Sequence, residues 1–137
     1  MKFLLILLFF TAFSWVQAQE CDCGAFVNGR FGELEVYPFD PIQVQSCEDV
    51  ESCSSTCDEE WATITNNGDL DTVLENGETL GQALCDTLAS EGQEDVPPHE
   101  VFLYYRICDG PWQYDEEQST AQVCCTAGTY HSCDVPP

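Results

Sequence analysis

The stretch Glu100–Cys108, EVFLYYRIC, decides the fold of this chain. It consists mainly of β-branched and aromatic residues, which favour β-strands. Successive side chains of a strand point to opposite faces, so alternate residues share a face. One face carries Val101, Leu103, Tyr105 and Ile107, and the other carries Phe102, Tyr104, Arg106 and Cys108. Both faces are largely apolar, and we therefore expect this strand in the centre of a small sheet.

A hairpin is predicted near the beginning of the chain. Asn28-Gly29 is a strong type I′ turn signal, and it separates residues 25–27 from Arg30-Phe31. We expect a short β-hairpin there, or one strand and a tight turn. Pro38 and Pro41 break the chain after it and indicate a loop.

Residues 48–66 predict a helix with one apolar face. Its apolar residues recur at steps of three and four, which places them on one side of a helix. They are Val50, Cys53, Cys57, Trp61 and Ile64. Because two cysteines are on this buried face, we expect disulfides to join the helix to the rest of the domain. Asn66-Asn67-Gly68 ends the helix.

Residues 79–90 predict a second helix. Thr79 and Gln82 fit a capping box, in which each side chain satisfies a backbone N–H of the first turn. The apolar stripe of this helix consists of Leu80, Leu84 and Leu88. Gly92 ends the helix, and the polar connector over residues 91–98 is expected to be exposed.

Two short segments complete the pattern. Residues 121–125 predict a strand, and residues 128–133 predict a closing turn or strand. The predicted elements run in the order strand, helix, helix, strand, strand. We therefore expect an α+β fold: a small disulfide-rich single domain with a short antiparallel sheet and two helices.

Ten cysteines follow residue 18: Cys21, Cys23, Cys47, Cys53, Cys57, Cys85, Cys108, Cys124, Cys125 and Cys133. An even and high number in a short chain is typical of a secreted disulfide scaffold, here with five bridges. Spacing does not choose among the many pairings. If Cys124 and Cys125 lie on a strand, they point to opposite faces and bond to different partners. A zinc site is disfavoured, because Cys53-x3-Cys57 fits one zinc knuckle but Cys21-x-Cys23 does not.

Residues 1–18 predict an export signal. Lys2 precedes an apolar run over residues 3–13, and Val16-Gln17-Ala18 is a small-residue cleavage site. We expect cleavage after Ala18 and a secreted, extracellular product of residues 19–137, whose length suits one domain. No stretch has the roughly 18 consecutive apolar residues of a transmembrane helix.

The chain has 25 acidic and three basic residues, and its formal net charge is −22. Once the signal with Lys2 is removed, only Arg30 and Arg106 remain as basic residues. This composition excludes a basic face for nucleic acid and polybasic attachment to a membrane. A high net charge keeps a secreted protein dispersed and attracts partners of opposite charge. We expect basic extracellular or matrix proteins as partners, and neither nucleic acid nor membrane.

The segment Asn67–Glu78, NGDLDTVLENGE, is a near match to a calcium-binding EF-hand loop. The side chains at its ligand positions are those of Asn67, Asp69, Asp71, Glu75 and Glu78, and Val73 would offer its carbonyl. A predicted helix flanks each end. Thr72, however, occupies the position where the sharp turn needs glycine. We expect a polar loop with solvated carboxylates, or at most a weak calcium site.

His99 and His131 are the two histidines, and they are the candidates for a general base at neutral pH. Neither lies in the motif of a serine, cysteine or metal hydrolase. Paired carboxylates are frequent here because acidic residues are frequent. We therefore expect surface histidines, no enzymatic activity and no cofactor.

Large rings and an arginine gather in one segment: Tyr104, Tyr105, Arg106, Trp112 and Tyr114. Aromatic and arginine side chains carry much of the binding energy of protein interfaces, so this segment could form a binding face. The alternative is that the rings pack in the core and on the sheet. The candidate binding residues are Tyr104, Arg106 and Trp112.

Several cysteine and aromatic motifs occur in a characteristic order: Cys21-Asp22-Cys23-Gly24-Ala25-Phe26 with Gly29-x-Phe31; Cys53-x3-Cys57; Leu84-Cys85; residues 101–108 with Trp112; and Cys124-Cys125-x2-Gly128-x-Tyr130-x-Cys133. In this order the chain resembles the arthropod follicle cell protein family. The resemblance implies a small secreted, disulfide-bonded protein with a place in the eggshell or another extracellular matrix. It carries over no catalytic residue.

The leading hypothesis is therefore a structural or interaction component of an extracellular matrix, such as an eggshell. The alternatives are a diffusible binding protein, for example a ligand, an inhibitor or a venom-type component, and a weak calcium-binding protein. A matrix component would be found in an insoluble layer. A diffusible protein would be found in fluid and would have a saturable partner.

Overall fold

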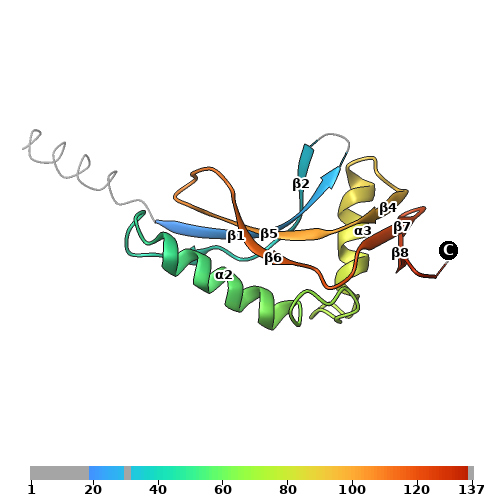
Figure 1. Ribbon diagram of the computed structural model, residues 1–137, viewed down its shortest axis with the longest axis horizontal. Coiled ribbons are helices and arrows are strands. Elements are labelled where there is room, and N and C mark those ends of the chain that lie inside the picture. The colour runs from blue at the N-terminus through green and yellow to red at the C-terminus, as the bar shows by residue number, and fades with distance from the viewer. Residues whose placement is uncertain (1–18, 30–31, 136–137) are drawn as a thin grey trace, which may run out of the picture.

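The computed structural model describes residues 19–29 and 32–135. The predicted export signal, residues 1–18, lies outside the described residues. Two antiparallel sheets and two helices make up the described part (Figure 1). This is the disulfide-rich α+β architecture that the sequence predicts.

The larger sheet has β5 (Val101–Ile107) in its centre. Along the sheet the strands are β2 (Gly32–Pro38), β1 (Glu20–Gly29), β5 and β6 (Gln113–Gln118), and all neighbours are antiparallel. The short strand β3 (Ile42–Gln43) also pairs with β1. The central position predicted for the EVFLYYRIC stretch is confirmed.

The register of β1 and β5 gives the sheet two different faces. The pairs on one face are Cys23–Tyr105, Ala25–Leu103 and Val27–Val101, and those on the other are Asp22–Arg106, Gly24–Tyr104 and Phe26–Phe102. Helix α2 (Val50–Ile64) lies along the first face, because disulfides from Cys21 and Cys23 reach it (Figure 1). The second face is called the outer face below.

Two adjacent disulfides, Cys21–Cys53 and Cys23–Cys57, join β1 to α2. They combine residues two apart on a strand with residues four apart on a helix, so both leave the same face of each element. Trp61 completes the buried stripe of α2, with 1% of its surface exposed. The prediction that Val50 belongs to this stripe is wrong. Val50 is 39% exposed, because it begins the helix before the turn that the first disulfide fixes to the sheet.

A second sheet has the order β4 (Val96–His99), β7 (Val123–Thr126) and β8 (Thr129–Ser132). The strands predicted near the end of the chain are confirmed. The connector predicted over residues 91–98 needs a correction, because Val96 is buried and pairs with Cys125. Its two prolines cannot donate ladder hydrogen bonds, and they are tolerated because β4 is an edge strand.

Helix α3 (Leu80–Ser90) packs against this second sheet. The Thr79 side chain accepts a hydrogen bond from the Gln82 N–H at 3.1 Å, as predicted. The Gln82 side chain does not complete the capping box. It binds the β7–β8 turn instead, donating to the Gly128 carbonyl at 2.9 Å and accepting from the Tyr130 N–H at 3.0 Å. The leucine stripe of α3 is fully buried.

The turn predicted at Asn28-Gly29 also needs a correction. Gly29 pairs with Gly32, so Asn28-Gly29 lies in β1, and the connection falls at residues 30–31, outside the described residues. A β-bulge between Ala25 and Phe26 shifts the register of β1 against β2. The pairing of Asn28 with Glu33 and of Gly29 with Gly32 thus overrides the local turn preference of Asn-Gly.

All ten cysteines are paired in five disulfides. Beyond the two bridges on α2, Cys47–Cys108 fixes the end of β5, Cys85–Cys125 joins α3 to β7, and Cys124–Cys133 closes the second sheet. Adjacent Cys124 and Cys125 have different partners, as predicted. Cys53 and Cys57, the pair considered as a zinc knuckle, are thus both bonded in disulfides. None of the described helices is long and apolar enough to span a bilayer.

Candidate functional site

Five aromatic rings from three strands or their ends meet on the outer face of the larger sheet. We call this cluster the aromatic face, and it consists of Phe26, Phe102, Tyr104, Trp112 and Tyr114. Phe26 comes from β1, Phe102 and Tyr104 from β5, and Tyr114 from β6. All four alternate with residues that face α2, which is why the sheet register brings them to the same side.

The rings pack edge-on or tilted against one another. Phe26 is the hub, because its ring centroid lies 4.9 Å from that of Tyr104 and 4.9 Å from that of Trp112. The ring of Tyr114 lies between those of Tyr104 and Phe102, with centroid distances of 5.8 Å to Tyr104 and 5.6 Å to Phe102. These distances and tilts are those of favourable aromatic pairs. Phe26 is buried, whereas Tyr114 is 44% exposed, so the cluster has a rigid base and an accessible top.

Arg106 lies beside the cluster and is already neutralised. Its guanidinium carbon is 4.6 Å from the centre of the Trp112 ring, which is a cation–π distance. Its Nε donates to the Asp22 carboxylate at 3.0 Å. Arg106 therefore orients Trp112 and leaves no uncompensated positive charge on this face.

Carboxylates form the rim of the aromatic face along β2. The Tyr104 hydroxyl donates to Glu33 at 2.8 Å, and burial, followed by this hydrogen bond, raises the pKa of Tyr104 to about 12. Burial also raises the pKa of Glu35, although nearby Arg106 opposes the shift. A Cβ on Gly24 would lie 2.4 Å from a Glu35 carboxylate oxygen, so glycine is needed for this carboxylate to lie over β1.

The structure thus brings together four of the five residues that the sequence singled out. Tyr104, Arg106, Trp112 and Tyr114 belong to one surface. Tyr105 lies on the opposite face of β5 and packs against the buried core, as the alternation along the strand and the core alternative both predict. The structure adds rings and acids that sequence reasoning did not include: Phe26, Phe102, Glu33 and Glu35. Of these, Phe102 was detectable, because it alternates with Tyr104 along the strand.

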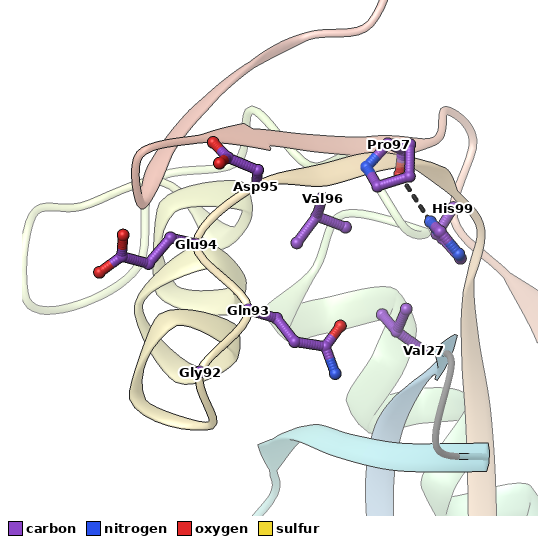
Figure 2. Close-up of a pocket in the computed structure, with 8 residues that line it drawn as sticks. All are labelled: Val27, Gly92, Gln93, Glu94, Asp95, Val96, Pro97 and His99. Carbon is purple, nitrogen blue, oxygen red and sulfur yellow. Dashed lines mark hydrogen bonds between the residues drawn. The ribbon is translucent and has the colours of Figure 1, made fainter.

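A separate pocket of about 580 Å³ lies between the end of α3 and the end of β1 (Figure 2). Val27 and Val96 form its apolar floor, and the Gln93 side chain points toward Val27, as Figure 2 shows. The His99 ring lies at the rim with Nδ1 2.5 Å from the Pro97 carbonyl oxygen. Glu94 points away from the cavity in this view. The lining of the pocket thus combines the Gln93 amide and the His99 ring with the acidic residues Glu94 and Asp95.

His131, the other candidate base, lies in a different place. Its Nε2 is 2.8 Å from the Thr126 hydroxyl, and its Nδ1 is 3.0 Å from the Ser132 carbonyl oxygen. Both contacts stay within the β7–β8 hairpin. The structure therefore does not bring the two histidines together into one site.

The loop considered as a weak calcium site is held by hydrogen bonds within residues 67–78 and by one bond to Tyr130. The Asp69 carboxylate accepts from the Asp71 N–H at 3.0 Å, and the Asp71 carboxylate accepts from the Tyr130 hydroxyl at 2.8 Å. The Leu74 N–H donates to the Glu78 carbonyl, which folds the second half of the loop on itself. Among the described residues, only Cys21, Cys53 and Cys57 place three metal-type ligand atoms within 4.8 Å. The weak calcium candidates Asn67, Asp69, Asp71, Glu75 and Glu78 therefore include no cluster of three carboxylates. This arrangement suits the polar loop that the sequence favours, and a weak calcium site stays a prediction.

We expect calcium to bind this loop no more tightly than the weakest extracellular sites, with a dissociation constant on the order of 10⁻³ M or above. The reason is that the carboxylates of Asp69, Asp71 and Glu78 would have to leave their present hydrogen-bond partners. Titration calorimetry of the wild type and of Glu78→Gln should give equal heats. A clear loss of heat in Glu78→Gln would show that the loop rearranges into a site.

Comparisons with family models, curated proteins and solved structures find no match to this chain. The resemblance to the arthropod follicle cell proteins therefore stays a prediction from the quoted motifs.

Proposed function

We propose that this protein is a secreted interaction protein of the extracellular matrix that binds a Lys/Arg-rich protein partner through its aromatic face. The observation that carries the proposal is the cluster of rings on the outer face, which ends in the exposed ring of Tyr114 and is bordered by Glu33 and Glu35. Exposed rings in a fixed arrangement resemble the anchors of protein interfaces.

Charge determines the kind of partner. The formal net charge is −22, and Arg106, the basic residue beside the rings, is paired with Asp22 and stacked on Trp112. The field around the face therefore attracts cations. A guanidinium group suits both parts of the surface, because it stacks on rings and binds carboxylates. The partner segment should combine basic side chains with apolar ones that cover the rings.

The matrix setting of this proposal is supported by the disulfide framework and by the resemblance to follicle cell proteins, which favours an eggshell. A diffusible binding protein is the alternative. Fractionation of the producing tissue separates the two hypotheses. A matrix component stays in an insoluble layer and is released by high salt, or by salt with a reductant. A diffusible component is recovered from fluid without either treatment.

Replacing Tyr114 with alanine should weaken binding of a synthetic peptide that alternates arginine with leucine by roughly tenfold. An interface anchor of this kind is worth more than about 1 kcal/mol, and 1.4 kcal/mol corresponds to tenfold. Tyr114 is 44% exposed, so its truncation should leave the fold intact. Calorimetric titration at two salt concentrations measures the effect. The wild-type affinity should fall as salt rises through ~0.1 M, because the attraction is then screened beyond about 10 Å.

Two variants with the same change in charge provide the control. Glu33→Gln removes a charge from the rim of the aromatic face, and Glu59→Gln removes one from the exposed side of α2. Peptide binding should weaken several-fold in Glu33→Gln and change little in Glu59→Gln. Equal losses in the two variants, or no loss in Tyr114→Ala, would show that only the diffuse field attracts the peptide.

A further inference from the structure

Strand β6 is shared between the aromatic face and a pair of carboxyl groups on the other side of the sheet. Tyr114 points to the outer face, and the next residue, Asp115, contacts α2. On α2, Ser54 donates a hydrogen bond to one oxygen of Asp115, and Asp58 lies one helical turn further on. A change in the charge or the contacts of Asp115 therefore acts directly on β6, the strand that carries Tyr114 of the aromatic face.

The carboxyl groups of Asp58 and Asp115 are neighbours, and each buries one oxygen. Asp58 Oδ1 and Asp115 Oδ2 are both buried and have no hydrogen-bond partner among the described residues. A carboxyl group that carries a proton can donate to a carboxylate, so one shared proton satisfies both oxygens. Two ionised carboxylates would leave both oxygens unsatisfied and would repel each other.

The surroundings favour the protonated form. Burial is the largest influence and raises the pKa of Asp115, and the contact with Asp58 raises it further. The Ser54 hydrogen bond lowers this pKa, and Glu117 on β6 raises it, with a result of about 7. Of the residues on β5, Tyr105 is on the α2 side, whereas Arg106 is on the outer face. The neighbouring residues of β1, Cys21 and Cys23, are in disulfides and do not titrate.

The backbone pairing of β6 with β5 is interrupted next to Asp115, so the contact of Asp115 with α2 is an additional attachment of β6 at this point. Tyr114 pairs with Tyr104 and Gln118 pairs with Phe102, so the register shifts between these two pairs. Within the shift, Glu116 has a positive φ of 59°, which is uncommon for a residue other than glycine. Residues 115–117 thus depart from regular pairing, and Asp115 contacts α2 through Ser54.

We propose that the Asp58–Asp115 pair is a proton-operated switch that regulates the aromatic face through β6. With one shared proton, the pair holds β6 on α2 and keeps Tyr114 in place. When both carboxyl groups ionise, their repulsion loosens β6 and the top of the aromatic face loses its fixed arrangement. Partner binding is therefore tighter in mildly acidic surroundings than above neutral pH. Only this last consequence rests on the proposed function.

The sign of the pH dependence follows from the raised pKa. An unfolded chain titrates Asp115 near 3.8, and the folded chain titrates it near 7. The contribution of the pair to stability is therefore fully present below about pH 4 and is lost as pH rises through 7. The window from pH 6 to 8 therefore brackets the pKa of Asp115.

The first experiment needs no partner. Carboxyl ¹³C NMR of the disulfide-bonded, secreted protein should show a titration of Asp115 with a midpoint near pH 7. The backbone amide of Tyr114 should shift with the same midpoint. Ser54→Ala should move the midpoint upward, because the Ser54 hydrogen bond lowers the pKa of Asp115. Asp115→Asn, which can donate to Asp58 at every pH, should abolish the shift of the Tyr114 amide in this window, and Glu59→Gln should retain it.

The second experiment adds the arginine–leucine peptide at pH 6 and pH 8. Its affinity should fall several-fold toward pH 8 in the wild type, and clearly less in Asp115→Asn. His99 and His131 are present in both proteins, so the comparison removes any contribution from them. Equal ratios in the two proteins, titration of both carboxyl groups below pH 5, or a Tyr114 amide that does not follow the pair would overturn the switch. A peptide that binds at neither pH would overturn the proposed function, and the NMR result would still decide the switch itself.

Discussion

Removal of both disulfides between β1 and α2 should destabilise the protein far more than removal of either one. The two bridges, Cys21–Cys53 and Cys23–Cys57, close nearly the same loop, with sequence separations of 32 and 34 residues. A disulfide stabilises mainly by restricting the unfolded chain, by roughly 3–4 kcal/mol for a loop of this length. While one bridge remains, the loop is still closed, so loss of the other should cost about 1–2 kcal/mol. Loss of both should cost about 4 kcal/mol or more.

Denaturant unfolding of the two single-bridge variants and of the double variant, with cysteines replaced by alanine, measures these losses. The coupling energy between the bridges should be clearly different from zero. The bridge Cys47–Cys108 provides the control, because it closes a separation of 61 residues that overlaps neither of the others closely. Removal of Cys47–Cys108 alone should therefore lower the free energy of unfolding by the full contribution of one bridge. Additive losses for the two α2 bridges would contradict the shared-loop explanation.

Replacing Trp61 with alanine should destabilise the protein by about 3–5 kcal/mol, the usual cost of deleting a large buried ring. Trp61 is 1% exposed and is the largest fully buried side chain in the described part. Its indole N–H is buried without a hydrogen-bond partner among the described residues. Trp61→Phe should therefore cost considerably less, because phenylalanine retains much of the ring and removes the unsatisfied donor.

The midpoint of urea unfolding tests this order, and Val50→Ala on the same helix is the matched control. Val50 is 39% exposed, so its truncation should change the free energy of unfolding by less than about 0.5 kcal/mol. A Trp61→Phe variant as unstable as Trp61→Ala would mean that the shape of the indole, and not the buried area, sets the stability of this region.

Elements with a strong period were predictable from the sequence. The central strand β5, the cysteine stripe of α2 and the Thr79 cap of α3 all follow from local spacing. Strand β6 was not predictable, because its sequence, QYDEEQ, is polar and acidic. An edge strand tolerates such residues, and charges there discourage pairing with another chain. The formation of β6 therefore depends on a tertiary contact, because the segment becomes a strand by pairing with the free edge of β5.

The candidate site was predictable only in part, for the same reason. Tyr104 and Arg106 share a face by simple alternation, and Trp112 follows shortly after. Phe26, the hub of the rings, comes from β1, and its position depends on the register of β1 against β5. The 67–78 loop has the ligand spacing of a calcium site, but its carboxylates form no cluster of three. Tyr130, a residue far away in the sequence, binds Asp71.

The pairing of β1 with β5 determines the order in which the chain can assemble. Asp22 and Arg106 bind each other across 84 positions of sequence, whereas the cysteines of β1 find their partners on α2 after 32 and 34 positions. During synthesis, β1 and α2 can thus be joined covalently long before β5 has emerged. Until then, the backbone groups of β1 that face β5 have no partner, and an unpaired strand edge is a template for aggregation. The newly made protein is therefore exposed to misassembly until β5, in the last third of the chain, has been synthesised and has paired with β1.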